Sequence, residues 1–215
     1  MPITGNARQL TFRANNLGKE IDLMLMFTPP AEGKLYSDLY PVCWKVLQFH
    51  SSGVSAATVH YSASTAFVAP QKDTDNIVSA YNVESCETGE LCALMTNDKG
   101  NNYLTKAAVG SKGVVQCKVQ TSTPAEVAFG LFNADKTTVN PVFKWTGLGI
   151  GSTLAVRLTP ILKIYAVSDY QASEIIKGDV HSEVKFEVDL MTLPHETNWN
   201  VIRDPVSKEI KIVRA

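Results

Sequence analysis

The sequence predicts an all-β fold, a single-domain antiparallel β-sandwich of about ten or more strands. Three observations lead to this class. Several segments alternate apolar and polar residues with a period of two, clusters of turn-forming residues separate them at short intervals, and no helical windows alternate with them. A chain of 215 residues lies within the size range of one sandwich, so we expect residues 1–215 to form one domain.

The first two strands are expected around Leu10 and Phe12, and over Ile21–Phe27. The second of these alternates as a strand should, although Met24 and Met26 make its other face apolar as well. Asn and Gly residues between the two segments suit a tight turn. We therefore expect this turn to join the two strands.

The middle of the chain contains most of the other candidate strands, and their separators are rich in Gly, Pro, Asn and Asp. Short helices fit at 36–39 or at 169–177, where the β pattern is weak. The candidate strands are residues 42–50, 56–69, 77–83, 91–96, 114–121, 127–132, 141–146 and 153–168.

The C-terminal part gives the clearest strand signal in the sequence. From Val184 to Leu190 every second residue is apolar, and each residue between them is charged. Side chains of a strand point alternately to opposite faces, so this segment is expected to lie half-buried on an antiparallel sheet. Two further strands, 197–203 and 209–214, are expected to form a hairpin around Asp204 and Pro205.

The charge balance argues against several classes of partner. The chain has 20 Lys and Arg against 21 Asp and Glu, a net charge of −1. Binding to nucleic acid or to an anionic membrane normally requires a basic surplus, so neither partner is expected. No run of 18 apolar residues occurs, and the N-terminus has no basic stretch that leads into an apolar one. These features predict a cytoplasmic protein.

The four cysteines do not form a metal-binding pattern. Cys43, Cys86, Cys92 and Cys117 include no C-x-x-C pair, so zinc-ligand spacing is missing and no metal is expected. We expect free thiols that behave as small apolar side chains. A bridge between Cys86 and Cys92 stays open as the alternative in an oxidising compartment.

Known catalytic motifs are not found. The glycine-rich segment 147–151 looks like a phosphate loop, but it lacks a Gly-Lys-Ser/Thr sequence and is followed by a strand-like stretch instead of a helix. A turn or bulge between strands is therefore the preferred interpretation. No Gly-x-Ser-x-Gly elbow occurs and no two histidines have metal-ligand spacing, so no catalytic residue is assigned. An enzyme whose residues converge only in space is the third interpretation.

The aromatic residues favour binding over catalysis. Tryptophan and tyrosine combine a large apolar surface with one polar group, which suits pockets for planar ligands as well as core packing. The leading hypothesis is a non-enzymatic protein that carries a small planar aromatic ligand or pigment. The alternative is a cytosolic fungal-type lectin or defence protein that stacks sugars on exposed Trp or Tyr, with 96–103 as the candidate sugar loop. The oligomeric state is open, and includes a homo-oligomer.

Three segments carry a resemblance to known proteins. Residues 40–46, residues 143–149 and the sequence Thr197-Asn198-Trp199 resemble a group of uncharacterised mushroom (basidiomycete) proteins of about this length. Size and overall character are also similar to those of the pink chromoproteins of oyster-type mushrooms. The resemblance implies a non-enzymatic carrier of a small, indole-derived chromophore. It assigns no functional residue.

The candidate ligand site lies around Trp145 and comprises Phe143, Trp145, Gly147, Gly149 and Tyr165. An indole ring can stack on a flat ligand, and glycines let the backbone approach it closely. We expect 141–146 and 153–168 to pair as a hairpin, which would place the start of the second strand opposite Trp145. Tyr165 is the most distant member, because the second strand must curve to bring it there.

Overall fold

The polypeptide is built almost entirely of β-strands. The computed structural model describes residues 5–70 and 76–215, and these contain strands β1 to β18 and one short 3-10 helix, η1 (Leu190–Thr192). The predicted all-β class is confirmed. Residues 36–39 and 169–177 form turns, short strand ends and single bridges, not helices.

The strands form four sheets, and the described strands pair antiparallel except for β1 with β17 and β8 with β11. In spatial order, sheet 1 consists of β18 (Ile210–Arg214), β17 (Glu196–Arg203), β1 (Arg8–Asn15) and β5 (Val54–Tyr61). Sheet 2 consists of β16 (Val184–Asp189), β15 (Ile161–Ala166), β2 (Ile21–Phe27) and β4 (Lys45–Phe49). Sheet 3 consists of β3 (Leu39–Pro41), β13 (Val139–Leu148), β12 (Ala125–Phe132), β6 (Thr65–Pro70) and β7 (Ala80–Ser85). Sheet 4 consists of β10 (Ala108–Val109), β8 (Glu90–Thr96), β11 (Val115–Gln120) and β14 (Thr153–Val156), with β9 (Asn102–Leu104) also paired to β8.

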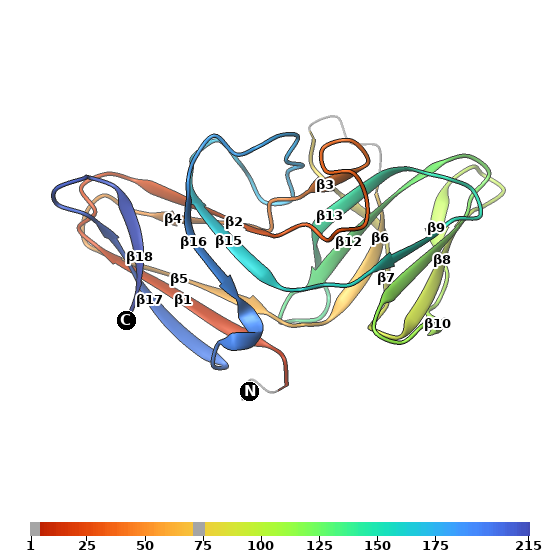
Figure 1. Cartoon of the computed structure of the whole chain (residues 1–215), viewed down its shortest axis with the longest axis horizontal. Coiled ribbons are helices and arrows are strands. Elements are labelled where there is room, and N and C mark those ends of the chain that lie inside the picture. The colour runs from red at the N-terminus through yellow and green to blue at the C-terminus, as the bar shows by residue number, and fades with distance from the viewer. Residues whose placement is uncertain (1–4, 71–75) are drawn as a thin grey trace.

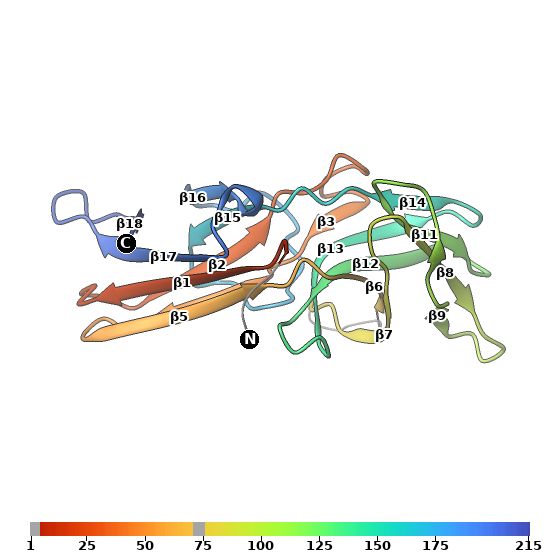
Figure 2. The same ribbon diagram turned by 90° about the horizontal axis from the view of Figure 1, so that it is seen from below.

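The sheets lie in two pairs along the long axis of the molecule. Sheets 1 and 2 form the left half of Figure 1, and sheets 3 and 4 form the right half; Figure 2 shows the same division from below. Sheets 1 and 2 pack face to face through aromatic rings, since the ring centroids of Phe186 in β16 and Trp199 in β17 are 5.4 Å apart. One continuous cluster of buried side chains contains residues of all four sheets. The architecture is thus a sandwich, and apolar faces of facing sheets form its core.

Nearly all strands of the right half come from one continuous segment of the chain, residues 65–156, which we call the excursion. Strands β6 to β14 follow one another there without a return, and of the other described strands β3 alone belongs to that half. The left half is built from the chain before and after this excursion, so β1 near the N-terminus pairs with β17 near the C-terminus.

Two sequence expectations about strands are corrected by the structure. Residues 15–19 do lead from β1 to β2, as expected; the two strands belong to facing sheets, and β1 pairs with β5 and β17. The stretch 56–69 is divided between β5 and β6, and 153–168 between β14 and β15, each pair in different sheets. Pro160 has no N–H to donate to a ladder, and it lies where the second of these stretches changes sheet.

The C-terminal predictions are confirmed. β16 occupies residues within the strongly alternating segment, and β17 and β18 form an antiparallel hairpin with Trp199 opposite Arg214 and Arg203 opposite Ile210. The Asp204 carboxylate closes the turn of this hairpin. It accepts hydrogen bonds from the backbone N–H groups of Val206 and Ser207, both at 2.9 Å.

A long connection, residues 167–183, covers the outer face where sheets 2 and 3 meet; we call it the strap. It is bonded to both sides: Ser173 N donates to Cys43 O at 2.8 Å, and Val78 N donates to Ser173 O at 2.9 Å. Ile176 of the strap packs against Met24 and Met26 on the outer face of sheet 2. The outer face of this sheet is thus buried as well, as the two methionines in β2 require.

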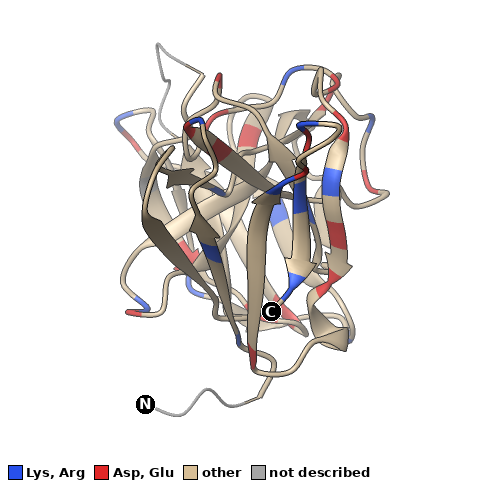
Figure 3. Ribbon diagram, turned by 90° about the vertical axis from the view of Figure 1, so that its left-hand side faces the viewer, with Lys and Arg blue, Asp and Glu red and all other residues tan. Residues whose placement is uncertain are grey.

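Charged residues of both signs are distributed over loops and strand surfaces. Figure 3 shows Lys and Arg interspersed with Asp and Glu over the end of the molecule that faces the viewer, in keeping with the net charge of −1. Nowhere in 5–70 or 76–215 does a helix have both the length and the apolar character that crossing a membrane would require.

Candidate functional site

A pocket of about 420 Å³ lies beside Trp145, between the end of sheet 3 and the start of sheet 4; we call it the Trp145 pocket. Its volume falls within the range of small-molecule sites, about 300–1,000 Å³. Three chain segments form it, namely the end of β13 with the turn after it, the strand β14, and the loop between β2 and β3. The lining residues are Glu32, Gly33, Asp38, Trp145, Thr146, Gly147, Leu148, Gly149, Ser152, Thr153, Leu154 and Ala155.

The loop between β2 and β3 is held against Trp145 by backbone contacts. The indole Nε1 of Trp145 donates to Glu32 O at 2.8 Å, and Thr146 N donates to Asp38 O at 2.9 Å. Gly33 makes this close approach feasible, because its φ is +114° and a Cβ there would lie 2.9 Å from the Cβ of Leu39. The loop and the strand therefore meet with no room for a larger residue at Gly33.

The same loop brings a carboxylate to the pocket. The backbone N–H of Lys34 donates to the side chain of Asp38, and Lys34 O accepts from the N–H groups of Ser37 and Asp38, both at 3.0 Å. This turn fixes the backbone of Asp38 at the pocket wall. Asp38 and Glu32 thus give one side of the pocket hydrogen-bond acceptors.

The glycine-rich turn forms the opposite side. It does not return the chain as a hairpin: β13 pairs with β12 and β3, β14 pairs with β11, and the turn between them passes from sheet 3 to sheet 4. The predicted pairing of 141–146 with 153–168 is therefore corrected. The turn is closed by Gly149 O, which accepts from the N–H of Ser152 at 3.1 Å and from its hydroxyl at 2.6 Å. A Cβ at Gly147 or Gly149 would meet no atom within 4 Å, so open space lies beside both residues.

The structure brings three of the five candidate site residues into one pocket. Trp145, Gly147 and Gly149 all line the Trp145 pocket. Phe143 lies two residues earlier on β13, with its ring 6.1 Å from that of Trp145, and lines a neighbouring pocket of about 390 Å³, the Phe143 pocket. Glu32 lines both pockets, and Arg157 lies in the second one.

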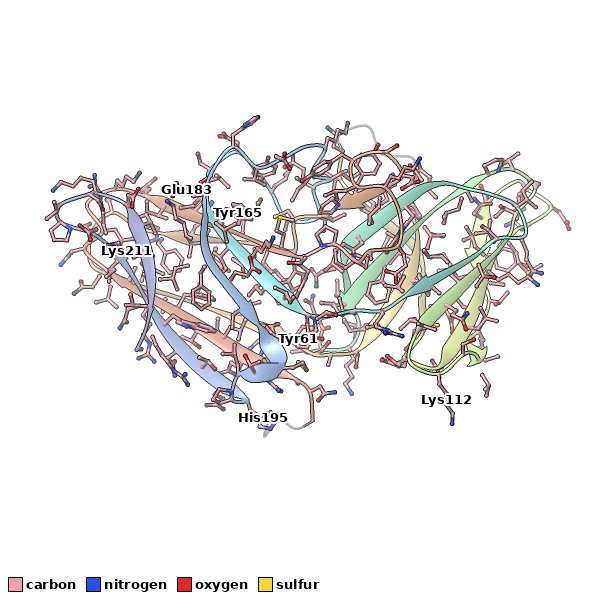
Figure 4. All side chains as sticks on the ribbon, viewed as in Figure 1. Tyr61, Lys112, Tyr165, Glu183, His195 and Lys211 are labelled. Atoms are coloured by element: carbon pink, nitrogen blue, oxygen red, sulfur yellow. The ribbon has the colours of Figure 1, made fainter. Side chains whose placement is uncertain are left out.

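Tyr165 is not part of either pocket. It lies on β15 in sheet 2 and packs against Met24, Met26 and Cys43 beneath the strap. Figure 4 places it in the left half beside Glu183, whereas Figure 2 shows β14 in the right half. The expectation that Tyr165 neighbours Trp145 assumed one curved strand from 153 to 168, and that strand is divided between two sheets.

Sequence reasoning missed the acidic side of the pocket. Glu32 and Asp38 precede Trp145 by more than 100 residues. The sequence predicts a separator at Glu32 and a short helix around Asp38, and neither prediction points to Trp145. The one local signal was Gly33, a glycine in a loop with two prolines, and glycine alone does not say which strand the loop contacts.

The tryptophans that a sugar platform could use are buried, and the tyrosines are partly or fully covered. Trp44, Trp145 and Trp199 are 1–2% exposed, and each tyrosine whose side chain is described is buried or half-buried. In the candidate sugar loop, Asn97 Oδ1 accepts from the N–H groups of Lys99 and Asn101 at 3.0 Å, so this oxygen already stabilises the turn.

The cysteines are free and buried. Cys92 and Cys117 lie opposite each other on β8 and β11. The pKa of Cys86 is raised, first by a hydrogen bond with Cys92 and second by burial of the thiol. Burial raises the pKa of Cys43 to about 12. The raised pKa values keep Cys86 and Cys43 protonated, which makes these two thiols poor nucleophiles and poor metal ligands. Within the described ranges, no three His, Cys, Asp or Glu side chains are grouped so that they could hold a metal ion.

Comparison with known proteins leaves the fold and the pocket as the basis for a functional assignment. No protein-family model matches this chain, and neither the curated proteins nor the solved structures include a significant match to it.

Proposed function

We propose that this protein is a non-enzymatic binding protein that holds a small planar aromatic ligand or pigment in the Trp145 pocket. The observation that carries the proposal is the pocket itself, which has the volume of a small-molecule site and combines apolar and polar walls. The resemblance to mushroom chromoproteins implies the same class of ligand.

The composition of the pocket favours a ligand that donates hydrogen bonds. Leu148 and Leu154 supply apolar contacts, whereas Glu32 and Asp38 add carboxylate acceptors. The Ser152 hydroxyl is already donated to Gly149 O, and one oxygen of Asp38 accepts from the N–H of Lys34. Such walls suit a flat ring system with N–H or ammonium groups, for example an indole derivative. The buried Trp145 ring supports the wall and is not a freely exposed stacking surface.

The most direct test is the protein purified from its natural source. We expect a co-purifying small molecule with an absorption band outside the range of the aromatic side chains, released on denaturation. A colourless preparation that releases no small molecule would contradict the pigment hypothesis.

A second test uses recombinant protein and a defined probe. We expect tryptamine, an indole with an ammonium group, to bind in isothermal titration calorimetry. Gly149→Leu should weaken binding by about tenfold or more, since a side chain there occupies open space at the pocket without a clash. Gly178→Leu is the matched control, because Gly178 lies outside the pocket and a Cβ there also meets no atom within 4 Å. Equal affinity in all three proteins would remove the Trp145 pocket as the site.

A glycan array tests the lectin alternative. The burial of Trp44, Trp145 and Trp199 predicts no specific sugar binding through a tryptophan platform. Specific binding of one glycan class would favour the lectin over the carrier. Cytoplasmic location and the lack of a nucleic-acid or membrane partner stay predictions.

A further inference from the structure

The strand β5 forms one free edge of sheet 1. Among the described strands, the spatial order of this sheet, β18-β17-β1-β5, leaves β5 paired on one side only, to β1. In Figure 2 it is the lowest ribbon of the left half, with no strand beyond it. With eight residues it is the longest edge strand of the four sheets.

The bonding pattern of β1 shows which groups of β5 are free. Gln9 N donates to His195 O at 2.7 Å, so the backbone of Gln9 is directed toward β17. Successive residues of a strand direct their N–H and C=O to alternate sides. The register Leu10↔Val59 and Phe12↔Ala57 then assigns the odd-numbered residues of β5 to the bonds with β1. The N–H and C=O groups of the even-numbered residues, from Val54 to His60, are directed away from the sheet.

This edge lacks the features by which proteins usually prevent strand addition. Charged residues, prolines, bulges or a very short length normally protect an edge. β5 reads Val-Ser-Ala-Ala-Thr-Val-His-Tyr and contains no Lys, Arg, Asp, Glu or Pro, and its register with β1 has no bulge. Each other edge strand contains a charged residue or a proline, or has four residues or fewer: β18, β16, β4, β3, β7, β9, β10 and β14.

We infer that β5 is a dimerisation edge at which two copies of this chain join by antiparallel strand addition. A two-fold axis at Ala57 places Val54 of one copy opposite His60 of the other, and Ala56 opposite Thr58. All four free residues of each copy then pair in register, and two four-stranded sheets become one of eight strands.

The sequence of the edge fits a second copy. An antiparallel self-pair places each residue opposite a residue of the same strand, and here these are small or uncharged, so no like charges meet. Ala57 lies opposite its own copy at the axis, where a larger side chain would crowd its equivalent. The net charge of −1 opposes association of two copies very little.

A cross-linking experiment tests the register. Directly opposite residues that do not exchange hydrogen bonds have Cα atoms about 4.5 Å apart, which a disulfide can span. Ala57→Cys should therefore give a covalent dimer when oxidised glutathione accepts the two electrons of the paired thiols. His60→Cys is the matched control on the same strand: its copies lie six residues apart along the strand, about 20 Å, and should not link. Efficient linking of His60→Cys without linking of Ala57→Cys would overturn the proposed pairing.

The oligomeric state gives a second, independent result. We expect light scattering after size exclusion to give twice the chain mass of 23.5 kDa, with dissociation on dilution. Thr58→Pro removes one outward N–H and the side-chain bond of Thr58 to Thr11, but leaves the backbone bonds to β1 intact. It should therefore weaken association by about tenfold or more while circular dichroism stays unchanged. Ile202→Lys, on β17 away from the edge, is expected to keep the dimer. A monomer at every concentration, or a dimer insensitive to Thr58→Pro, would refute the inference.

Discussion

Two glycines near the Trp145 pocket differ in what surrounds them. Gly33 has a φ of +114°, and a Cβ there would lie 3.2 Å from Trp145 Nε1. Gly149 has no such φ and open space beside it. One glycine is therefore needed for the fold of the loop, and the other leaves room in the pocket.

Alanine substitution should separate these two roles. Gly33→Ala is expected to lower the free energy of unfolding by at least about 2 kcal/mol, from backbone strain and crowding. Gly149→Ala should change it by less than about 1 kcal/mol. Urea denaturation of the two variants beside the wild type measures both effects, and similar losses in the two would contradict this assignment.

Trp145 permits a graded test of its own contribution to stability. Trp145→Phe keeps most of the buried ring but removes the bond from Nε1 to Glu32 O, a loss of about 1 kcal/mol. Trp145→Ala empties a core position that is 2% exposed and should cost about 3–5 kcal/mol. The midpoints of urea unfolding give the order. A phenylalanine variant as unstable as the alanine variant would show that the hydrogen bond outweighs the ring.

Residues that are close in sequence were the ones that sequence analysis placed together correctly. Trp145, Gly147 and Gly149 share one pocket because they lie so near one another in the sequence that the chain cannot place them far apart. Tyr165 was misplaced because sequence spacing does not reveal a change of sheet. Glu32 and Asp38 could not be assigned, since their proximity to Trp145 arises only when the loop packs on β13.

Among the elements, the C-terminal hairpin contains the best-defined exposed ion pair. Asp204 accepts from Lys211 Nζ at 2.6 Å as well as from the backbone of its own turn. Hydrogen bonds from Lys211 and from the turn lower the pKa of Asp204 below its ordinary value. A carboxylate whose pKa is lowered on folding stabilises the folded state above its unfolded pKa, and this contribution is lost as the pH falls.

This gives a pH-dependent prediction for Asp204→Asn. Asparagine keeps an oxygen for the turn but removes the charge, so the variant should melt at a lower temperature than the wild type at pH 7. The difference should shrink below about pH 4, where the carboxylate of the unfolded chain is already protonated. Melting temperatures from pH 2 to 7 test it, and a difference independent of pH would exclude the ionised carboxylate as its cause.

Strands were easier to predict than the connections between them. Alternation in 183–190 identified β16 because one face of the strand is charged along its whole length. Turn residues predict that a strand ends but not where the chain goes next. Asn16 and Gly18, with φ values of 50° and 77°, have the conformations of a hairpin turn, yet they lead β1 into a facing sheet. The strands that pair with β1 are β5 and β17, which lie far from it in the sequence and are selected by packing.

The whole molecule contains several buried groups whose protonated form is favoured. Burial, with a hydrogen bond to Asp179, raises the pKa of Tyr36 to about 12, and burial raises the pKa values of Tyr61 and Cys43 to about 12 as well. Their ordinary values are 10.0 for tyrosine and 9.0 for cysteine. A raised pKa stabilises the folded state below the ordinary value, and this contribution is lost as the pH rises toward 12.

The protein should therefore lose stability in alkali while its thiols stay protected at neutral pH. We expect the urea midpoint to fall between pH 8 and pH 11. At pH 8 the folded protein should leave its four cysteines unreactive toward a disulfide reagent such as Ellman's, and all four should react in urea. A midpoint that rises with pH, or rapid reaction of the folded protein, would contradict the burial of these groups.

The excursion of the chain into sheets 3 and 4 has a consequence for biosynthesis. The strands from β6 to β14 leave the ribosome together, so the right half can assemble during translation as soon as residue 156 has emerged. The left half must wait, because β1 gains its parallel partner β17 only after residue 203 has been synthesised. Until then β1 and β5 form an incomplete sheet with exposed apolar residues, and a nascent chain at that stage is a natural client for a chaperone.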